Sequence, residues 1–363
     1  MYKGTGISKD QLSDDGEPCI LYGELYTKYK SETIREVISK TNIDNTKLVR
    51  SKANDVIIPC SGETAEDIAT ARCVLNGNIL LGGDLNIIRL HGYDGAFMSY
   101  QLNGRRKYDI AKVAQGVSVV HLYGEHLKGV KTINPCLEEQ KKIAKLLSLL
   151  DERIATQNKI IEDLKKLKSA IIEIEYTPNT KTTSHIGNVI EQISKRNKNN
   201  AIQNVLSVSN RQGFIKQSDQ FENRNVASED TSNYKIVEKN DFAFNPARIN
   251  VGSIARLTTF ENGIVSPMYI CFRTQENVAP EYIDFFFESK HFYCEIQKRL
   301  EGSVRQCLSF EGLCNIPFSL PSLEMQQRIG KRLFTLGQKI KTETDLLELL
   351  NKQKQYLLRQ MFI

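Results

Sequence analysis

A long stretch of this sequence occurs twice, as PCLEEQKKIAKLLSLLDERIATQNKIIEDLKKLKSAIIEIEY at residues 135–176 and as PSLEMQQRIGKRLFTLGQKIKTETDLLELLNKQKQYLLRQMF at residues 321–362. The two copies align without a gap at one constant offset, the repeat offset, which places Pro321 opposite Pro135, and 14 of their 42 positions are identical. The same offset relates Leu122 to Leu308, upstream of the two copies. Self-similarity at a fixed spacing indicates duplication. We therefore predict two related halves, with sequences that diverge further upstream.

Both copies have the hydrophobic spacing of a long helix. Apolar residues recur at steps of three and four positions or their multiples, which is typical of a coiled-coil seam. A helix of ~40 residues cannot bury such a stripe alone, so we predict that the copies pair antiparallel about a pseudo-two-fold axis. The alternatives are helices that lie separately on their own domains or that pair between two chains. The seam residues are Ile143, Leu147, Leu150, Ile154, Ile161, Leu164 and Ile171, and then Ile329, Leu333, Leu336, Ile340, Leu347, Leu350 and Leu357.

Polar residues interrupt both seams at equivalent places. These are Gln157 and Glu343 at one position and Lys168 and Lys354 at the other. A polar group in an apolar seam opposes slipped registers. We therefore expect these four residues to fix how the helices pair.

The remainder of the chain has the pattern of mixed domains. Short apolar runs bounded by Gly, Asn, Asp and Pro predict strands and turns, for example at 55–59, 77–83 and 241–246. Short helices are expected at 64–75, 104–114 and 280–300. The predicted fold class is α+β, with two mixed α/β domains and two long antiparallel coiled-coil helices. The expected boundaries are 1–134 for the first domain, 135–176 for the central helix, 177–184 for a linker, 185–320 for the second domain and 321–363 for the C-terminal helix.

Composition narrows the class of protein. Of the 363 residues, 40% are hydrophobic and 25% are charged, and the sequence contains neither a 20-residue apolar span nor a signal-peptide pattern. We expect a cytoplasmic protein that does not engage a membrane. The net charge of +6, from 49 Lys and Arg against 43 Asp and Glu, is compatible with a polyanionic partner.

The sequence lacks the motifs of catalytic and metal sites. The eight cysteines are scattered without a CxxC pair, and the five histidines lack HExxH spacing, so we expect free, mostly buried thiols and no metal. The run Asn245-Pro246-Ala247 lacks the second proline and the aromatic residue of an adenine methyltransferase motif. No glycine-rich phosphate loop occurs in a strand-to-helix context. We therefore predict no catalytic residue, no cofactor and no enzyme activity.

Five quoted segments carry a family resemblance. They are SGETAEDIATA at 61–71, LLGGDLNIIR at 80–89, AQGVSVVHLYGEHLKGVKTINPCLEEQKKIAKLLSLLDERI at 114–154, NDFAFNPARINVGSIA at 240–255 and PSLEMQQRIGKRL at 321–333. Together with the domain-then-helix duplication, they resemble the specificity subunit of type I restriction-modification systems across almost the whole chain.

The resemblance implies a function and a set of partners. In that family, two target-recognition domains each read one part of a split site in double-stranded DNA, while the two similar helices set their spacing and bind methyltransferase subunits. A restriction and translocase subunit joins through the complex. The alternative is a coiled-coil scaffold whose domains bind protein, and salt-dependent affinity for duplex DNA distinguishes the two. An enzyme with an undetected active site is a third class.

Candidate DNA-contacting residues follow from the chemistry of base edges. Arg pairs best with guanine, and Asn or Gln pairs best with adenine. In the first domain the candidates are Tyr22, Tyr26, Thr27, Lys28, Arg105, Arg106, Lys107, His121 and Tyr123. In the second they are Arg211, Gln212, Asn245, Arg248, Asn250, Arg305 and Gln306.

The two domains open differently. The second begins with a strand-like run at 185–190, whereas the first begins at Met1 with no equivalent strand. Since family members usually carry one there, we expect a chain that is truncated or starts late, with an unpaired sheet edge in the first domain.

Overall fold

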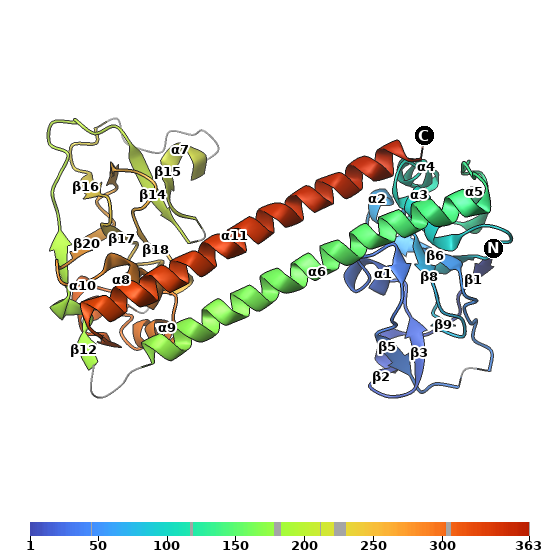
Figure 1. Cartoon of the computed structure of the whole chain (residues 1–363), viewed down its shortest axis with the longest axis horizontal. Helices are drawn as coiled ribbons and strands as arrows, with labels where there is room; N and C mark the ends of the chain where they lie inside the picture. Colours follow the sequence, from blue (N-terminus) through green and yellow to red (C-terminus); the bar gives the residue numbers. More distant parts are fainter. Residues whose placement is uncertain are drawn as a thin grey trace. The chain divides into compact units, whose positions relative to one another are not determined.

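The computed structural model describes residues 1–44, 46–116, 119–177, 183–210, 212–220, 230–302 and 306–362. The chain divides into two compact units, one made of Met1–Ile160 with Glu343–Ile363 and the other of Ile161–Thr342. The long helices α6 (Leu137–Tyr176) and α11 (Leu323–Gln360) each contribute residues to both units (Figure 1). Each unit therefore combines a mixed α/β domain with one end of each helix.

Unit 1 is built on two sheets. A larger sheet has the strand order β1-β10-β6-β8-β4, a second has the order β2-β5-β3-β9, and β7 pairs with β11. The strands are β1 (Tyr2–Lys3), β2 (Leu12–Ser13), β3 (Glu17–Ile20), β4 (Thr33–Ile34), β5 (Ser39–Thr41), β6 (Asp55–Pro59), β7 (Ser61–Gly62), β8 (Arg72–Val74), β9 (Leu80–Leu81), β10 (Leu85–Ile88) and β11 (Val120–His121). The helices are η1 (Lys9–Gln11), α1 (Glu24–Thr27), α2 (Ala65–Ile68), α3 (Gly95–Asn103), α4 (Lys107–Val113) and α5 (Gly124–Lys128).

Unit 2 repeats this plan. Its sheets have the orders β13-β20-β17-β18 and β15-β14-β19-β16, and β12 pairs with β21. The strands are β12 (Thr183–His185), β13 (Ile190–Ile193), β14 (Val205–Ser209), β15 (Gly213–Lys216), β16 (Lys235–Glu238), β17 (Phe242–Phe244), β18 (Ile254–Arg256), β19 (Asn262–Val265), β20 (Ile270–Thr274) and β21 (Pro317–Ser319). The helices are η2 (Ile186–Asn188), α7 (Gln217–Gln220), η3 (Ile249–Val251), α8 (Pro280–Phe286), α9 (Lys290–Gln297) and α10 (Phe310–Cys314).

The duplication continues into the sheets, where the sequences of the halves diverge. In unit 1, β3 runs parallel to β9 with Cys19 opposite Leu80, and in unit 2, β14 runs parallel to β19 with Val205 opposite Ile264. Cys19 and Val205 are related by the repeat offset, as the two long helices are. Burial requires only an apolar residue of suitable size at such positions, so backbone pairing is retained while side chains change.

The two long helices pair antiparallel. In unit 1 the N-terminal part of α6 meets the C-terminal part of α11, where Gln157 Nε2 donates to the Glu343 carbonyl oxygen at 2.9 Å. In unit 2 the C-terminal part of α6 meets the N-terminal part of α11, where Arg332 lies 3.6 Å from Glu175. The predicted seam residues are buried or half-buried throughout, which confirms the seam. Gln157 and Glu343 are also equivalent in the repeat, so the seam pairs a position with its own copy.

The predictions of short elements were less accurate. The expected helix at 64–75 was wrong beyond Ile68, because the chain becomes strand β8. The segment 280–300 forms two helices, α8 and α9, separated by a break whose Ser289 side chain caps α9. Helix α3 was not predicted at all, because nearly all of its residues are buried and it has no polar face to give a helical period.

The edge of the larger sheet in unit 1 is paired. Tyr2 stands opposite Ile87, so β1 covers β10 as β13 covers β20 in unit 2. The unpaired sheet edge that we expected in the first domain is therefore not found beside β10. The β12–β21 pair of unit 2 has no counterpart among the described residues of unit 1.

Candidate nucleic-acid interface

Each unit carries the same polar anchor beside its central strand. Arg89 donates to both carboxylate oxygens of Asp55 at 3.0 and 2.8 Å, and Arg273 donates to both oxygens of Asp241 at 3.0 Å. The two aspartates are related by the repeat offset; Asp55 begins β6, and Asp241 directly precedes β17. Bidentate pairs of this kind fix orientation as well as adding energy. The two Asp–Arg pairs therefore fix the start of β6 and of β17, and the chain after each of these strands lines a groove.

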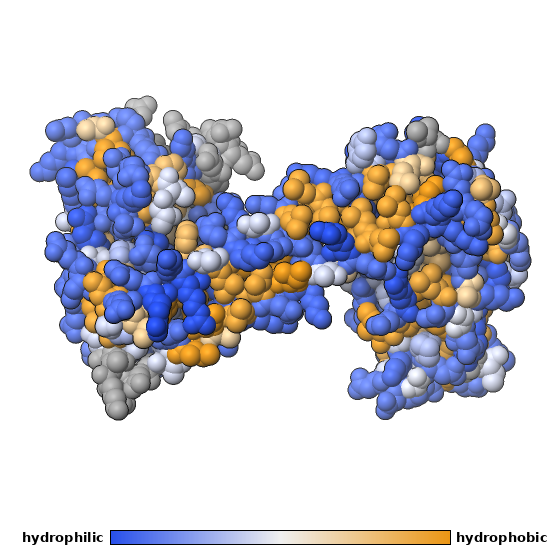
Figure 2. Space-filling view, viewed as in Figure 1, coloured by the Kyte–Doolittle hydropathy of each residue, from blue (hydrophilic) through white to orange (hydrophobic). Residues whose placement is uncertain are grey.

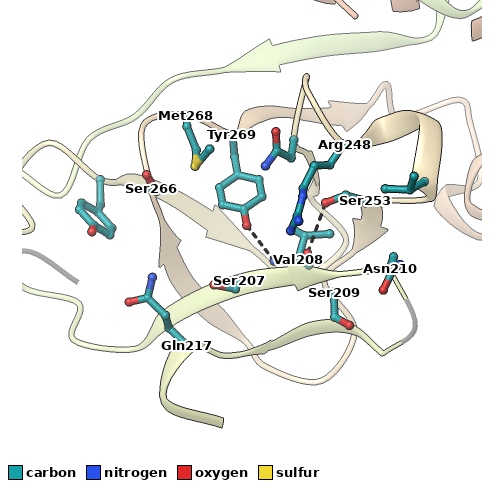
Figure 3. A pocket seen from close by; sticks show the side chains of 13 residues that line it. Ser207, Val208, Ser209, Asn210, Gln217, Arg248, Ser253, Ser266, Met268 and Tyr269 are labelled. Carbon is teal, nitrogen blue, oxygen red and sulfur yellow. Dashed lines mark hydrogen bonds between the residues drawn. The ribbon is translucent and has the colours of Figure 1, made fainter. Parts of the chain in front are cut away.

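Unit 2 has a polar groove of about 450 Å³ at the end of this strand (Figure 3). The segment from β14 forms its floor, and the Val208 amide donates to the Tyr269 hydroxyl at 3.3 Å. Ser253 Oγ donates to the Val208 carbonyl at 3.3 Å, which ties the turn carrying Arg248 to that floor. The lining residues are Ser207, Val208, Ser209, Asn210, Gln217, Tyr234, Asn245, Arg248, Val251, Ser253, Ser266, Met268 and Tyr269.

Unit 1 has a groove of about 570 Å³ at the corresponding place. Tyr26 lines it and donates from its hydroxyl to the Ser61 carbonyl at 3.1 Å. Burial raises the pKa of Tyr26 well above its usual value, and the Asp67 carboxylate adds to that effect. The lining residues are Tyr22, Gly23, Tyr26, Thr27, Ser61, Gly62, Glu63, Asp67 and Val119.

The two grooves occupy equivalent positions in the repeat. The Leu122 amide donates to the Cys60 carbonyl at 2.8 Å in unit 1, and the Leu308 amide donates to the Pro246 carbonyl at 3.0 Å in unit 2. The two donors are related by the repeat offset, and so are the two acceptors. Gly62, two positions after Cys60, lines the groove of unit 1. Arg248, two positions after Pro246, lines the groove of unit 2. A shared backbone frame therefore presents unlike side chains.

The structure brings three of the candidates in unit 1 together. Tyr22, Tyr26 and Thr27 line the groove, whereas Lys28 turns away to pair with buried Glu24 at 2.7 Å. Lys28 also donates to Ser39 at 2.7 Å, so its charge is used within the fold.

The other unit 1 candidates lie elsewhere. Arg105 and Lys107 line a separate groove of about 810 Å³ beside Arg359 of α11. Arg106 is largely buried and lies 3.4 Å from Asp109. His121 is exposed on β11, next to the strand that lines the main groove, and stacks on exposed Tyr123 with ring centroids 6.3 Å apart.

In unit 2, Asn245 and Arg248 line the groove. Asn250 is half-buried in η3, and Gln212 and Gln306 are exposed outside the lining. Arg211 and Arg305 lie outside the described residues. Sequence reasoning missed the contributions of Asn210, Gln217, Ser253 and Met268 in unit 2, and of Ser61, Glu63 and Asp67 in unit 1, since these residues carry no motif and meet only in the fold.

The chemistry of these surfaces suits binding. Within the described part of the chain, no group of three or more His, Cys, Asp and Glu side chains could hold a metal ion. Burial raises the pKa of the Cys60 thiol to about 11, so it remains protonated and a poor nucleophile at neutral pH. All eight cysteines are free, but the expectation that most are buried holds for only half of them. No helix among the described residues is long and apolar enough to cross a bilayer.

Comparison with known proteins identifies the family. A family model described as the type I restriction modification DNA specificity domain matches residues 3–166 and again residues 171–352. The chain belongs to this family. The resemblance in the sequence and the predicted fold class are thereby confirmed, as is the assignment of a non-catalytic specificity subunit in such a system.

Relatives and solved structures agree with this membership. The type I restriction enzyme MjaVIII specificity subunit of Methanocaldococcus jannaschii is 24% identical over 368 residues, which cover 93% of this chain and 82% of that one. A putative MjaX specificity subunit of the same organism is 27% identical over 64% of this chain and 56% of its own. The S subunit structure from M. genitalium has a TM-score of 0.60 at 17% identity, covering 100% of this chain and 93% of that one. A chain from a structure of the type I R-M system has a TM-score of 0.53 at 13% identity, covering 98% and 93%. Both structures show that the fold is shared.

Proposed function

We propose that this specificity subunit reads a bipartite site in double-stranded DNA, and that residues 1–134 and 185–320 are its two target-recognition domains. The observation that carries the proposal is the pair of grooves, which share a frame and differ in their side chains. Recognition of two different DNA segments requires this combination of a constant scaffold and variable contacts. Methylation and cleavage of the site then belong to partner subunits in the cytoplasm.

The groove linings support contact with base edges. Hydroxyl and amide groups dominate the unit 2 lining, and these groups both donate and accept hydrogen bonds. The unit 1 lining places tyrosines and a threonine beside two carboxylates. Such groups distinguish bases in the major groove, whereas phosphate contacts come chiefly from basic residues and backbone amides.

Salt-dependent binding tests this function. The full chain, copurified with its methyltransferase, should bind duplex DNA with an affinity whose logarithm falls linearly with the logarithm of the salt concentration, because binding releases counterions. Duplexes that contain the recognised sequence should also be bound far more tightly than duplexes of random sequence. Affinity for DNA that is equal for all sequences, or absent, would favour the protein scaffold.

We further propose that the helices 135–176 and 321–363 dock methyltransferase subunits, and that the restriction subunit joins through that complex. Large apolar side chains remain exposed on both helices (Figure 2). Contiguous exposed apolar surface is uncommon outside interaction sites. The most exposed of them are Leu146, Leu149, Leu349 and Tyr356 in unit 1 and Leu167, Ile174 and Phe334 in unit 2.

Point substitutions test docking better than deletion of α11, because Leu358 and Phe362 belong to the core of unit 1. Leu349→Glu with Tyr356→Glu should abolish copurification of the methyltransferase, since both side chains are more than half exposed and their loss leaves the fold intact. Lys352→Glu, on the same helix, is the control for added negative charge. Retention of the methyltransferase by the double variant would count against this interface.

A further inference from the structure

We infer that the groove of unit 2 takes the edge of a guanine and that Arg248 reads it, so that one half of the split site contains a guanine requirement. The inference deepens the proposed function and rests on it, because it assigns a base to a groove proposed to meet DNA. The equivalent position in unit 1 is Gly62, so the requirement applies to one half only.

A closed turn fixes the backbone of Arg248. Its amide donates to the Asn245 carbonyl at 3.0 Å, and its own carbonyl accepts from Ser253 at 3.1 Å and from Val251 at 3.2 Å. Asn245 closes the turn a second time, since its side-chain oxygen accepts from the Ala247 amide at 3.1 Å. A contact residue held in this way loses little backbone freedom on binding, which favours specific recognition.

The guanidinium of Arg248 is available to a ligand. Arg256 is held by Asp284 at 3.1 Å and by Glu281, and Arg273 is held by Asp241. By contrast, the side chain of Arg248 forms no hydrogen bond or ion pair with any described residue, and it is exposed. Figure 3 shows it extending from its turn across the groove toward Val208 and Ser253. Among the described lining residues, no carboxylate is present to neutralise it.

The surroundings favour a base over a phosphate. Phosphate contacts typically gather several basic side chains and backbone amides, but Arg248 is the single Lys or Arg in the described lining. Around it lie uncharged Asn210 and Gln217 and the apolar wall of Met268. The planar fork of an arginine matches the O6 and N7 acceptors that guanine presents in the major groove. The other bases do not present that pair of acceptors.

The groove of unit 1 provides the contrast. It has glycine at the place of Arg248, its described lining contains no Lys or Arg, and Glu63 and Asp67 contribute carboxylates. Carboxylates accept hydrogen bonds and repel the acceptors of guanine. The two halves of the recognised site should therefore differ at the positions that these equivalent residues face.

Selection from duplexes with a randomised region tests the inference. The full chain, with its methyltransferase, is used as wild type, Arg248→Ala, Arg248→Lys and the control Lys290→Ala, which alters an exposed lysine on α9 outside the groove. The wild type should enrich two separated segments, one with a required guanine. Arg248→Ala should lower the preference for that guanine by roughly 5- to 150-fold and leave the other segment unchanged. Arg248→Lys should retain part of the preference, and the control all of it.

Different failures have different meanings. If the wild type enriches a bipartite sequence and Arg248→Ala keeps every preference, the guanine assignment is overturned while the proposed function stands. If Arg248→Ala weakens all duplexes alike, Arg248 contacts phosphate and the assignment is again overturned. If the wild type enriches no sequence, the proposed function itself fails. An unchanged melting temperature of Arg248→Ala confirms that any effect comes from contact and not from misfolding.

Discussion

Lys354 is the residue that most directly fixes helix α11 to the domain of unit 1. Its ammonium lies 2.6 Å from Glu32 and 2.6 Å from Asp151, and all three side chains are largely buried. Asp151 also accepts from the Tyr100 hydroxyl at 2.7 Å and from Ser31 at 2.9 Å. The cluster joins α6, α11 and the domain at one point. In unit 2 the equivalent Lys168 has a single ion pair among the described residues, with Glu288.

Replacement of Lys354 by methionine should destabilise unit 1 by about 3–5 kcal/mol, because it leaves two buried carboxylates without their counter-charge. Chemical unfolding of the full chain measures the change. Lys352→Met, on the exposed face of the same helix, removes only a surface pair with Glu348 and should change stability by less than about 1 kcal/mol. Equal effects of the two substitutions would contradict a role for burial.

The same variant should respond unusually to acid. Burial raises the pKa of Glu32 above its ordinary value of 4.5, although Lys354 opposes that rise. A raised folded-state pKa means that the folded protein binds more protons than the unfolded chain between 4.5 and the raised value, so stability increases as pH falls through that range. We expect Lys354→Met to recover part of its lost stability as pH falls from neutral towards 4.5, and to recover more stability than the wild type gains over the same range. If the free energy of unfolding changes with pH in the same way for the wild type and Lys354→Met, Glu32 is not the cause of the effect.

Single residues also show where sequence reasoning succeeds and where it fails. The polar interruptions at Gln157 and Lys354 were visible in the seam, because a regular apolar spacing makes an exception stand out. Lys28 was chosen for its charge, yet Glu24 lies four residues before it on one helical turn and pairs with that charge. Asn210 and Gln217 could not be found, since the sequence gives no sign that they converge with Arg248.

At the scale of elements, two glycines in α11 have opposite roles. A Cβ at Gly330 would lie 2.9 Å from the Glu281 Cβ on α8, whereas a Cβ at Gly337 would meet nothing within 4 Å. Gly330 therefore allows α11 to approach the domain of unit 2 closely. Gly337 serves no packing purpose and only weakens the helix.

Alanine substitutions separate these roles. Gly337→Ala should raise the free energy of unfolding by about 0.5–1 kcal/mol, because alanine has the higher helix propensity. Gly330→Ala gains the same propensity but must displace α8, and overpacking of this kind costs about 1–3 kcal/mol, so a net loss is expected. Thermal unfolding of both variants gives the comparison. A gain in stability from Gly330→Ala would show that the close approach is not required.

The elements that sequence predicted best are those with a period of their own. Apolar residues at steps of three and four predicted both long helices, and short apolar runs bounded by turn residues located β6 and β17. Periodicity fails for α3, because Phe97 packs in one core cluster and Met98 in another, so the helix has no solvent-facing stripe. It fails again at β8, whose three residues are too few to compete with the preceding helix pattern.

At the scale of the whole molecule, the two halves produced by duplication keep the same backbone pairings, while the side chains in their grooves differ. The Asp–Arg anchors, the parallel strand registers and the backbone bonds beside each groove recur in both halves, while Gly62 and Arg248 show that the groove residues do not. A direct alignment of the two domains with each other depends on these side chains and does not detect the common backbone hydrogen bonds. The structure recovers the equivalence because hydrogen bonds between main-chain atoms tolerate almost any side chain.

Mapping of methylated DNA with the full chain and its methyltransferase tests most directly whether the two grooves read separate segments. The measurement compares the wild type with Tyr22→Ala in the groove of unit 1 and Asn210→Ala in the groove of unit 2. We predict a methylated site of two specific segments at a fixed separation, in which each variant relaxes a different segment. A continuous site, or two variants that relax the same segment, would contradict the account.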